Sequence, residues 1–262
     1  MPEIEPRNLA VKKLEGLHLY HSGVSNCSMR VRLVLEEKGL NWESHHFNLL
    51  KKEHINEAYF GINPNGLVPT LVHDGRVIIE SGDIIEYLDK VFPEPALTPV
   101  DGKAAENMRS WINRATSMHM KAVKTHIYEK RVRGHMSQAP EEKARYEQLQ
   151  TNESLLEFHR KSTSDSFTQE ELDAAKATLD ASFADLEEAL AGSDWLAGSE
   201  FSLADIAWIP LHFTLFVLAG YSFEGMPNVN AWAKRIEARP SYAKAVVDWW
   251  PSEMQPLTQQ AS

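Results

Sequence analysis

The chain has 262 residues, of which 43% are hydrophobic and 24% are charged, and its formal net charge is −10. This composition is typical of a soluble globular protein, and the length suffices for two domains of ordinary size. No apolar run approaches the roughly 20 residues of a membrane helix, and the negative charge argues against a nucleic-acid partner. The single cysteine, Cys27, excludes an internal disulfide and fits a reducing cytoplasm.

The first 16 residues lack the apolar segment of a secretory signal, and we expect residues 1–16 to form a mobile leader. The histidines are scattered and have no metal-ligand spacing, so no metal site is predicted. We expect a first domain over residues 17–99 and a second over residues 100–262.

Residues 17–39 read as a strand, a loop and a helix. The first four alternate apolar and polar side chains, as a short strand does. Ser25 can cap a following helix, and Gly39 suits the left-handed stop at its end. Asn26 and Cys27 would then lie at a helix N-terminus, where free N–H groups and the helix dipole stabilise an anion. On these residues alone, Ser25 could equally be only a cap and Cys27 only a small buried side chain.

The next elements complete an α/β unit. Residues 41–49 alternate as a second strand, and residues 51–60 are weakly helical. Residues 67–80 read as a hairpin, in which Pro69 lacks an N–H and therefore belongs at a strand start, with a cis bond possible. Ser81 then opens a helix, which gives a second anion site. Strand, helix, strand, hairpin and helix in this order indicate a thioredoxin-like α/β domain.

The rest of the chain is helical almost throughout. Residues 104–128 and 169–190 repeat apolar side chains at steps of three and four, as amphipathic helices do. A polar stretch lies between them and is expected to be partly helical over residues 141–160. Ser202 and Asp205 form a capping box ahead of an apolar helix, so Asp205 is structural and no catalytic candidate.

The first domain contains five short motifs: Ser25-Asn26-Cys27-Ser28-Met29-Arg30-Val31-Arg32, Asn63-Pro64, Val68-Pro69-Thr70-Leu71, Glu80-Ser81 and Ile84-Ile85-Glu86-Tyr87-Leu88. Together they resemble the glutathione-binding domain of cytosolic glutathione transferases, and the resemblance covers about residues 17–250. It implies the glutathione transferase fold: a thioredoxin-like α/β N-terminal domain followed by an all-α C-terminal domain.

The resemblance also implies how glutathione, the co-substrate, would be bound. In that family the proline of the Val68-Pro69 pair is cis, and the residue before it pairs through its backbone with the cysteinyl part of glutathione. The Glu80-Ser81 pair would bind the γ-glutamyl end. Ser81 would offer its hydroxyl and N–H groups to the carboxylate, and Glu80 its carboxylate to the ammonium.

Such an enzyme must hold glutathione as a thiolate, although a free thiol titrates near pH 8.5. Alignment with zeta-like transferases places Ser25 on their activating serine and Cys27 on a cysteine found there. Asn26 stands where those enzymes have serine, and its amide could also donate to the thiolate. Tyr20 lies within the first strand and is a poor substitute for the tyrosine of other classes. The choice between Ser25 and Asn26 therefore stays open, as does a catalytic role for Cys27.

Two bacterial groups resemble the chain beyond the first domain: glutathione-dependent β-aryl etherases that cleave lignin β-O-4 units, and tetrachlorohydroquinone reductive dehalogenases. We expect the etherase reaction, in which the thiolate displaces an aryloxide and gives a thioether and a phenol. The alternatives are a zeta-like dehalogenase or isomerase that uses Cys27, and a non-catalytic glutathione-transferase-like binding module.

Family resemblance further implies a dimer, either a homodimer or a heterodimer with a related subunit, and a hydrophobic aromatic substrate. Some side chains of the second domain could line the substrate site, although each also fits plain core. These are Trp111, Met118, His119, Tyr128, Phe213 and Phe216.

Overall fold

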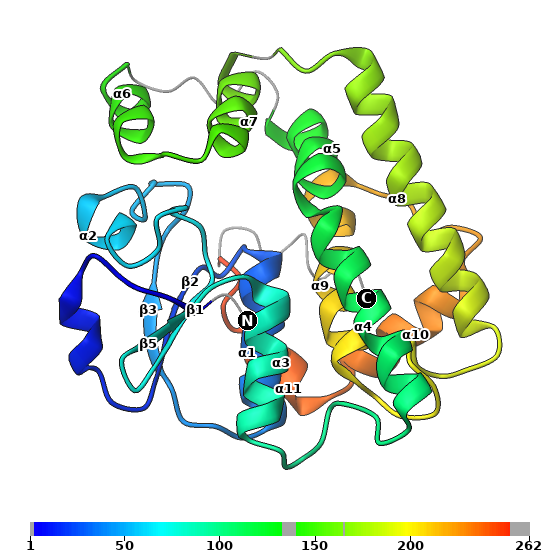
Figure 1. Cartoon of the computed structure of the whole chain (residues 1–262). Helices are drawn as coiled ribbons and strands as arrows, with labels where there is room; N and C mark the ends of the chain where they lie inside the picture. The colour runs from blue at the N-terminus through cyan, green and yellow to red at the C-terminus, as the bar shows by residue number, and fades with distance from the viewer. Residues whose placement is uncertain (1–2, 133–139, 165, 252–262) are drawn as a thin grey trace.

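The computed structural model describes residues 3–132, 140–164 and 166–251. Their fold has a mixed sheet with helices in the first part of the chain and a helical second part beside it (Figure 1). The predicted division at residue 100 falls between the last helix of the first part and the first helix of the second. No helix among these residues is long and apolar enough to span a bilayer.

The sheet has five strands in the order β1-β5-β4-β2-β3. β2 pairs in parallel with β3 across the crossover helix α1 and antiparallel with β4, and β4 and β5 form the predicted hairpin. The strands are β1 (Glu3–Ile4), β2 (Leu17–His21), β3 (Glu43–His46), β4 (Thr70–His73) and β5 (Arg76–Ile78).

Helices α1 and α3 share the core with β2, β4 and β5. The helix boundaries agree with the predicted starts at Ser25 and Ser81, and Gly39 has the expected positive φ, 60°. The helical segments of this part are the 3₁₀ turn η1 (Leu9–Lys13), α1 (Asn26–Glu37), α2 (Glu57–Phe60) and α3 (Ser81–Val91).

The prediction of a mobile leader is wrong for residues 3–16, because this segment is part of the first domain. β1 pairs antiparallel with β5, with Ile4 opposite Val77. In η1, Val11 is buried in a cluster that includes Val77 and Tyr59. The segment thus covers the edge of the hairpin, which would otherwise expose unpaired backbone groups.

The second part begins with a long helical rod, in which the helix predicted over residues 104–128 changes character. Its α-helical section ends at Ser117, and wider π-helical turns continue from His119. Such turns are rare and occur frequently at functional sites. The segments are α4 (Gly102–Ser117), η2 (His119–Lys124), α5 (Thr125–Ile127) and η3 (Tyr128–Val132).

The remaining helices confirm the amphipathic helix over residues 169–190 and the capping box of Ser202 and Asp205. α9 is buried along most of its length and packs against α1 and α4. These helices are α6 (Pro140–Leu149), α7 (Glu153–Ser164), α8 (Gln169–Leu190), α9 (Leu203–Ala219), α10 (Pro227–Glu237), α11 (Pro240–Tyr242) and the π turn η4 (Ala243–Val247).

α6 and α7 extend over the first domain on the side of α2 (Figure 1). The Gln150 amide donates to the Asn65 carbonyl at 2.8 Å, and the Asn152 amide donates to the Asn65 side chain at 3.3 Å. Lys52, in the loop before α2, forms an ion pair with Glu142 of α6. The predicted partly helical stretch is therefore bound to the loop that precedes β4.

Candidate active site

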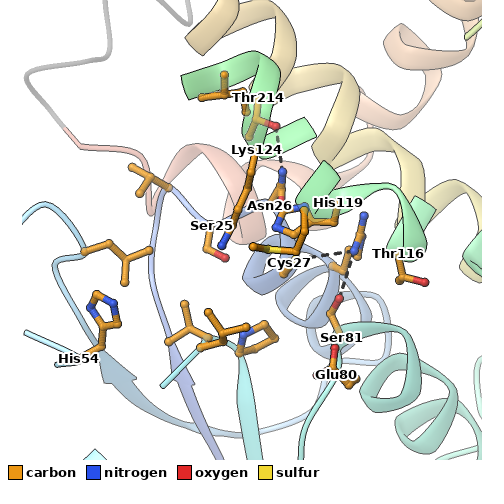
Figure 2. A pocket seen from close by; sticks show the side chains of 18 of the residues that line it. Ser25, Asn26, Cys27, His54, Glu80, Ser81, Thr116, His119, Lys124 and Thr214 are labelled. Atoms are coloured by element: carbon orange, nitrogen blue, oxygen red, sulfur yellow. Dashed lines mark hydrogen bonds between the residues drawn. The ribbon is translucent and has the colours of Figure 1, made fainter. Parts of the chain in front are cut away.

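A cavity of about 330 Å³ lies between the two domains. Its size is in the range of small-molecule binding sites. Its walls come from the N-terminus of α1, the loop before β4, the N-terminus of α3, η2 and α9 (Figure 2). All seven site residues predicted from the sequence line it: Ser25, Asn26, Cys27, Val68, Pro69, Glu80 and Ser81.

Ser25 is the N-cap of α1. Its hydroxyl oxygen accepts the Ser28 N–H at 3.2 Å, which satisfies one free donor of the first turn. The side chain is half-buried and lines the cavity. Since this hydrogen bond uses an oxygen lone pair, the hydroxyl hydrogen of Ser25 remains available to a ligand.

Asn26 is buried and is held by the second domain. Its amide nitrogen donates to the Thr214 hydroxyl oxygen at 3.3 Å. Thr214 in turn donates to the Pro210 carbonyl at 2.7 Å, within α9. One of the two amide hydrogens of Asn26 is therefore committed to a contact between the domains.

Cys27 is half-buried and is a free thiol. The Arg30 guanidinium, one turn along α1, donates to its sulfur at 3.7 Å. The same guanidinium donates to the Ser81 hydroxyl at 3.1 Å and so joins the two helix N-termini. Its other donors reach the carbonyls of Ala207 at 2.8 Å and Ala115 at 3.2 Å. Arg30 thereby fixes both loops against the second domain.

Val68 and Pro69 line the cavity, and the peptide bond between them is cis. Val68 precedes β4 and is outside its ladder. Its backbone N–H and C=O have no backbone partner among the residues that the structure describes. A ligand with an extended backbone can therefore pair with them.

Glu80 and Ser81 stand at the start of α3. Glu80 has a φ of 66°, a left-handed conformation that is unfavourable for a residue other than glycine. Although Glu80 is largely exposed, the surrounding protein removes water from its carboxylate, and with Asp83 nearby this raises its pKa. Ser81 is buried, and its N–H belongs to the free first turn of the helix. A carboxylate that can accept hydrogen bonds and an anion site thus lie side by side.

Two further groups come from η2. Lys124 lines the cavity and is half-buried, and burial lowers the pKa of its ammonium, while Cys27 raises it. His119 also lines the cavity, and burial together with the charges of Lys124 and Arg30 holds its pKa well below the usual value. His119 is therefore neutral at physiological pH.

Comparison with known proteins places this geometry in a family. The family model for the glutathione S-transferase N-terminal domain matches residues 19–96, and that for the glutathione S-transferase C-terminal domain matches residues 149–240. Protein LigF of Sphingobium sp. is 33% identical over 86% of this chain and 91% of that protein. The chain belongs to the glutathione S-transferase family.

Solved structures of glutathione S-transferases agree with the fold. The crystal structure of β-etherase LigF has a TM-score of 0.80 at 31% identity and covers 87% of this chain and 98% of its own. The structure of a theta-class enzyme of Xanthomonas axonopodis with glutathione bound has a TM-score of 0.68 at 23% identity. It covers 89% of this chain and 98% of its own. Glutathione S-transferase TCHQD of Arabidopsis thaliana is 28% identical over 88% of this chain and 89% of that protein.

Of the six side chains expected to line the substrate part of this glutathione S-transferase, only His119 lines the cavity. Trp111 is partly buried and packs edge-on against the core residue Trp208, and Phe213 packs against Trp250 within the core. The periodicity of apolar residues identifies which face of a helix is buried. It does not tell which residues of that face pack in the core and which line a cavity. The others outside the cavity are Met118, Tyr128 and Phe216.

Sequence reasoning missed Thr214, Lys124 and His54 as cavity residues. Thr214 lies in an apolar helix and Lys124 in an amphipathic one, where a threonine or lysine is ordinary. His54 follows a charged segment and looks solvated, yet it lines the cavity, and burial with Lys124 nearby lowers its pKa to about 4. No local pattern marks these three residues, because their positions depend on contacts between domains.

Proposed function

We propose that this glutathione S-transferase is a β-etherase, in which glutathione thiolate displaces an aryloxide from lignin-derived β-O-4 aryl ethers. The observation that carries the proposal is the similarity to β-etherase LigF, which extends over both domains at 31% identity. The cavity supports it, because helix N-termini and cations surround a space of suitable size.

In this proposal, glutathione lies along the first domain. Val68 pairs through its backbone with the cysteinyl part, and Pro69 holds that backbone toward the cavity. Ser81 and the first N–H groups of α3 bind the γ-glutamyl carboxylate, and Glu80 binds the ammonium. The available backbone groups of Val68 and the position of Glu80 beside the start of α3 support this orientation.

Ser25 is the proposed donor to the thiolate. Its hydroxyl hydrogen is available and the N-terminus of α1 adds positive potential. Asn26 is less suited, since its amide is buried and donates to Thr214. We assign Asn26 the role of holding the loop against α9.

The chemistry is a single displacement. The glutathione sulfur attacks the carbon that carries the aryl ether, the carbon–oxygen bond breaks, and its electron pair leaves with the aryloxide. The proton that glutathione lost on binding is matched by the proton that the phenol gains. The protein must therefore stabilise the thiolate, align it with the leaving oxygen and stabilise the developing negative charge.

A second candidate rests on Cys27. Its sulfur lies in the cavity and accepts a hydrogen bond from the Arg30 guanidinium at 3.7 Å. A zeta-like reductive dehalogenase or isomerase would use this cysteine, and a dehalogenase would form a mixed disulfide with glutathione. The two candidates therefore differ in whether Cys27 becomes covalently attached.

We also propose a dimer, either of this chain or with a related subunit, an aromatic substrate and a role in lignin-derived aromatic catabolism. The family resemblance supports the dimer, and the similarity to β-etherase LigF supports the substrate class. A cytoplasmic location remains a prediction from the single cysteine.

The deciding experiment is product analysis by mass spectrometry after the protein is mixed with glutathione and a panel of aryl ethers and chlorohydroquinones. A β-etherase releases the free phenol and a glutathione thioether from β-O-4 ketones. Release of chloride from the hydroquinones with glutathione attached to Cys27 would favour the second candidate. Binding of glutathione without any product would contradict both.

A further inference from the structure

The Lys124 amino group lies in the cavity without an anionic partner among the residues that the structure describes. Its Nζ lies 5.9 Å from the centre of the Phe158 ring, and no carboxylate is within ion-pair distance of it among the described residues. Arg30, the other cavity cation, differs because its donors are used by two backbone carbonyls, Ser81 and Cys27. The charge of Lys124 is therefore available to a ligand.

The surroundings of Lys124 disfavour an isolated charge. From α1 it faces Cys27, from the loop before α2 it faces His54, and from its own segment His119, with Arg30 beyond. Glu80 is the one carboxylate among the cavity residues, and it lies at the start of α3. A partly buried cation is costly unless a bound anion offsets the lost hydration, so the site is complementary to a negative charge.

The position of Lys124 indicates which negative charge of the reaction it would bind. It comes from the second domain and points toward the loop of Ser25 and Cys27, whereas Glu80 and Ser81 lie at the other helix N-terminus (Figure 2). The γ-glutamyl carboxylate has its own donors there. The charge that develops near the sulfur but outside glutathione is the one on the leaving oxygen.

We propose that Lys124 is a catalytic residue whose ammonium binds the departing aryloxide oxygen and protonates it, an assignment that rests on the proposed β-etherase function. As the sulfur–carbon bond forms and the carbon–oxygen bond breaks, the oxygen takes the electron pair and then a proton from Nζ. The neutral amine regains a proton from solvent, where the proton of the glutathione thiol was released.

The electrostatics of the site agree with this role. Burial lowers the pKa of Lys124, although Cys27 partly opposes the shift. A phenol titrates near pH 10, as the tyrosine side chain does. A lowered pKa makes the Lys124 ammonium a stronger acid than an exposed lysine, which favours proton transfer to the aryloxide.

The test compares Lys124→Met and Lys124→Arg with Lys121→Met, a matched control on the exposed side of the same segment. For each variant, kcat is measured with two β-ethers of the same ketone, one that releases guaiacol and one that releases 4-nitrophenol. The phenolate of 4-nitrophenol is a far weaker base than that of guaiacol. For Lys124→Met we expect kcat to fall on the order of 100-fold with guaiacol and less than about threefold with nitrophenol. Lys124→Arg keeps the positive charge but cannot give up a proton, so it should recover only part of the loss, and Lys121→Met should match the wild type.

Equal losses for both leaving groups in Lys124→Met would overturn the assignment while the β-etherase function stands. If the wild-type protein released no phenol from either ether, the proposed function would fall, and the catalytic role of Lys124 with it.

Binding supplies a readout that needs no turnover. We saturate the protein with S-methylglutathione and follow the ionisation of added 4-nitrophenol by its absorbance. The wild type and Lys124→Arg should bind the phenolate and lower its apparent pKa, and Lys124→Met should not. The same apparent pKa with Lys124→Met as with the wild type would contradict a phenolate site at Lys124.

Discussion

At the N-terminus of α1, Ser25, Asn26 and Cys27 differ in what each can still offer a ligand. Ser25 keeps its hydroxyl hydrogen, Asn26 donates to Thr214, and Cys27 receives a hydrogen bond from Arg30. We expect Ser25→Ala to raise the pKa of bound glutathione and to lower turnover near neutral pH by about 10- to 100-fold. Ultraviolet absorbance of the bound thiolate against pH measures the first effect.

The matched change Cys27→Ser separates the two chemistries. If glutathione is the only nucleophile, this variant should keep its ether cleavage within a small factor, because displacement leaves no disulfide to resolve. A folded, glutathione-bound Cys27→Ser protein that is inactive on every aryl ether would instead favour covalent use of the cysteine. Asn26→Ala serves as the second comparison, since a larger loss there than in Ser25→Ala would assign the donor role to the amide.

At the start of α3, Glu80→Ala and Ser81→Ala should weaken glutathione binding much more than they lower saturated turnover. Both groups lie away from the sulfur, and loss of a charge-assisted hydrogen bond costs about 1.5–3 kcal/mol, or roughly 10- to 150-fold in Kd. Isothermal titration with glutathione gives the affinity. Glu86→Ala, one turn further along α3 and outside the cavity, is the control, and unchanged affinity in both test variants would refute the assignment.

Among the elements, α9 depends on a buried cap. Asp205 accepts hydrogen bonds from Ser202, from the Leu196 N–H at 3.0 Å and from the Trp232 indole at 2.8 Å. Burial raises the pKa of Asp205 to about 6, and the hydrogen bonds from these donors lower it in part. If the carboxylate is removed, these donors lose their hydrogen-bond partner. The cap therefore joins α9, α10 and the loop before them.

We expect Asp205→Ala to lower the free energy of unfolding by about 3 kcal/mol or more, because it leaves several buried donors unsatisfied. The matched control is Thr168→Ala, which removes the capping box of α8 at an exposed position and should cost about 1 kcal/mol. Urea unfolding followed by tryptophan fluorescence measures both. Similar losses of unfolding free energy in the two variants would show that the buried Asp205 cap stabilises the fold no more than an exposed cap does.

At the scale of the whole molecule, buried neutral histidines make stability depend on pH. Burial and the Arg32 charge lower the pKa of His21 to about 2, and burial lowers that of His212 to about 4. The unfolded chain binds protons at these groups below about pH 6.5, whereas the folded chain does not. These two histidines therefore leave the free energy of unfolding nearly unchanged above about pH 6.5. As the pH falls below that value they lower it, by about 1.4 kcal/mol per histidine at pH 5.5.

His212→Phe tests this linkage. Both ring nitrogens of His212 are buried without a hydrogen-bond partner, and the ring stacks on Phe223 at 4.2 Å, so phenylalanine can replace it. We expect the variant to be at least as stable at pH 7.5 and to lose about 1.4 kcal/mol less than the wild type between pH 7.5 and 5.5. An unchanged loss in urea unfolding at the two pH values would contradict a neutral His212 in the folded state.

The proposed dimer is tested on the same scale. Light scattering after size exclusion should give twice the chain mass of 29.7 kDa. Measuring the purified chain by itself distinguishes a homodimer from a heterodimer. A homodimer forms from this chain alone, whereas a heterodimer requires the related subunit. A mass of one chain that does not change with concentration would overturn the homodimer.

Local interactions explain what could be predicted from the sequence. The Ser25 cap and the Ser202 and Asp205 capping box involve residues three apart, and the hairpin turns at Asp74 and Gly75 between two apolar runs. Their geometry is determined within a few residues, so the pattern predicts it correctly. The seven candidate site residues were predicted from the resemblance to glutathione transferases, and all of them line one cavity.

Only the tertiary structure decided the features that join distant residues. Glu3 and Ile4 form a strand because Val77 and Ile78 offer an open edge, and no signal within residues 1–16 reveals that partner. Lys124 has the spacing of an ordinary solvated lysine, yet the wide turns of η2 and the packing of the two domains direct it into the cavity. Periodicity specifies which side chains avoid water, whereas the space left between two packed domains depends on how their surfaces meet.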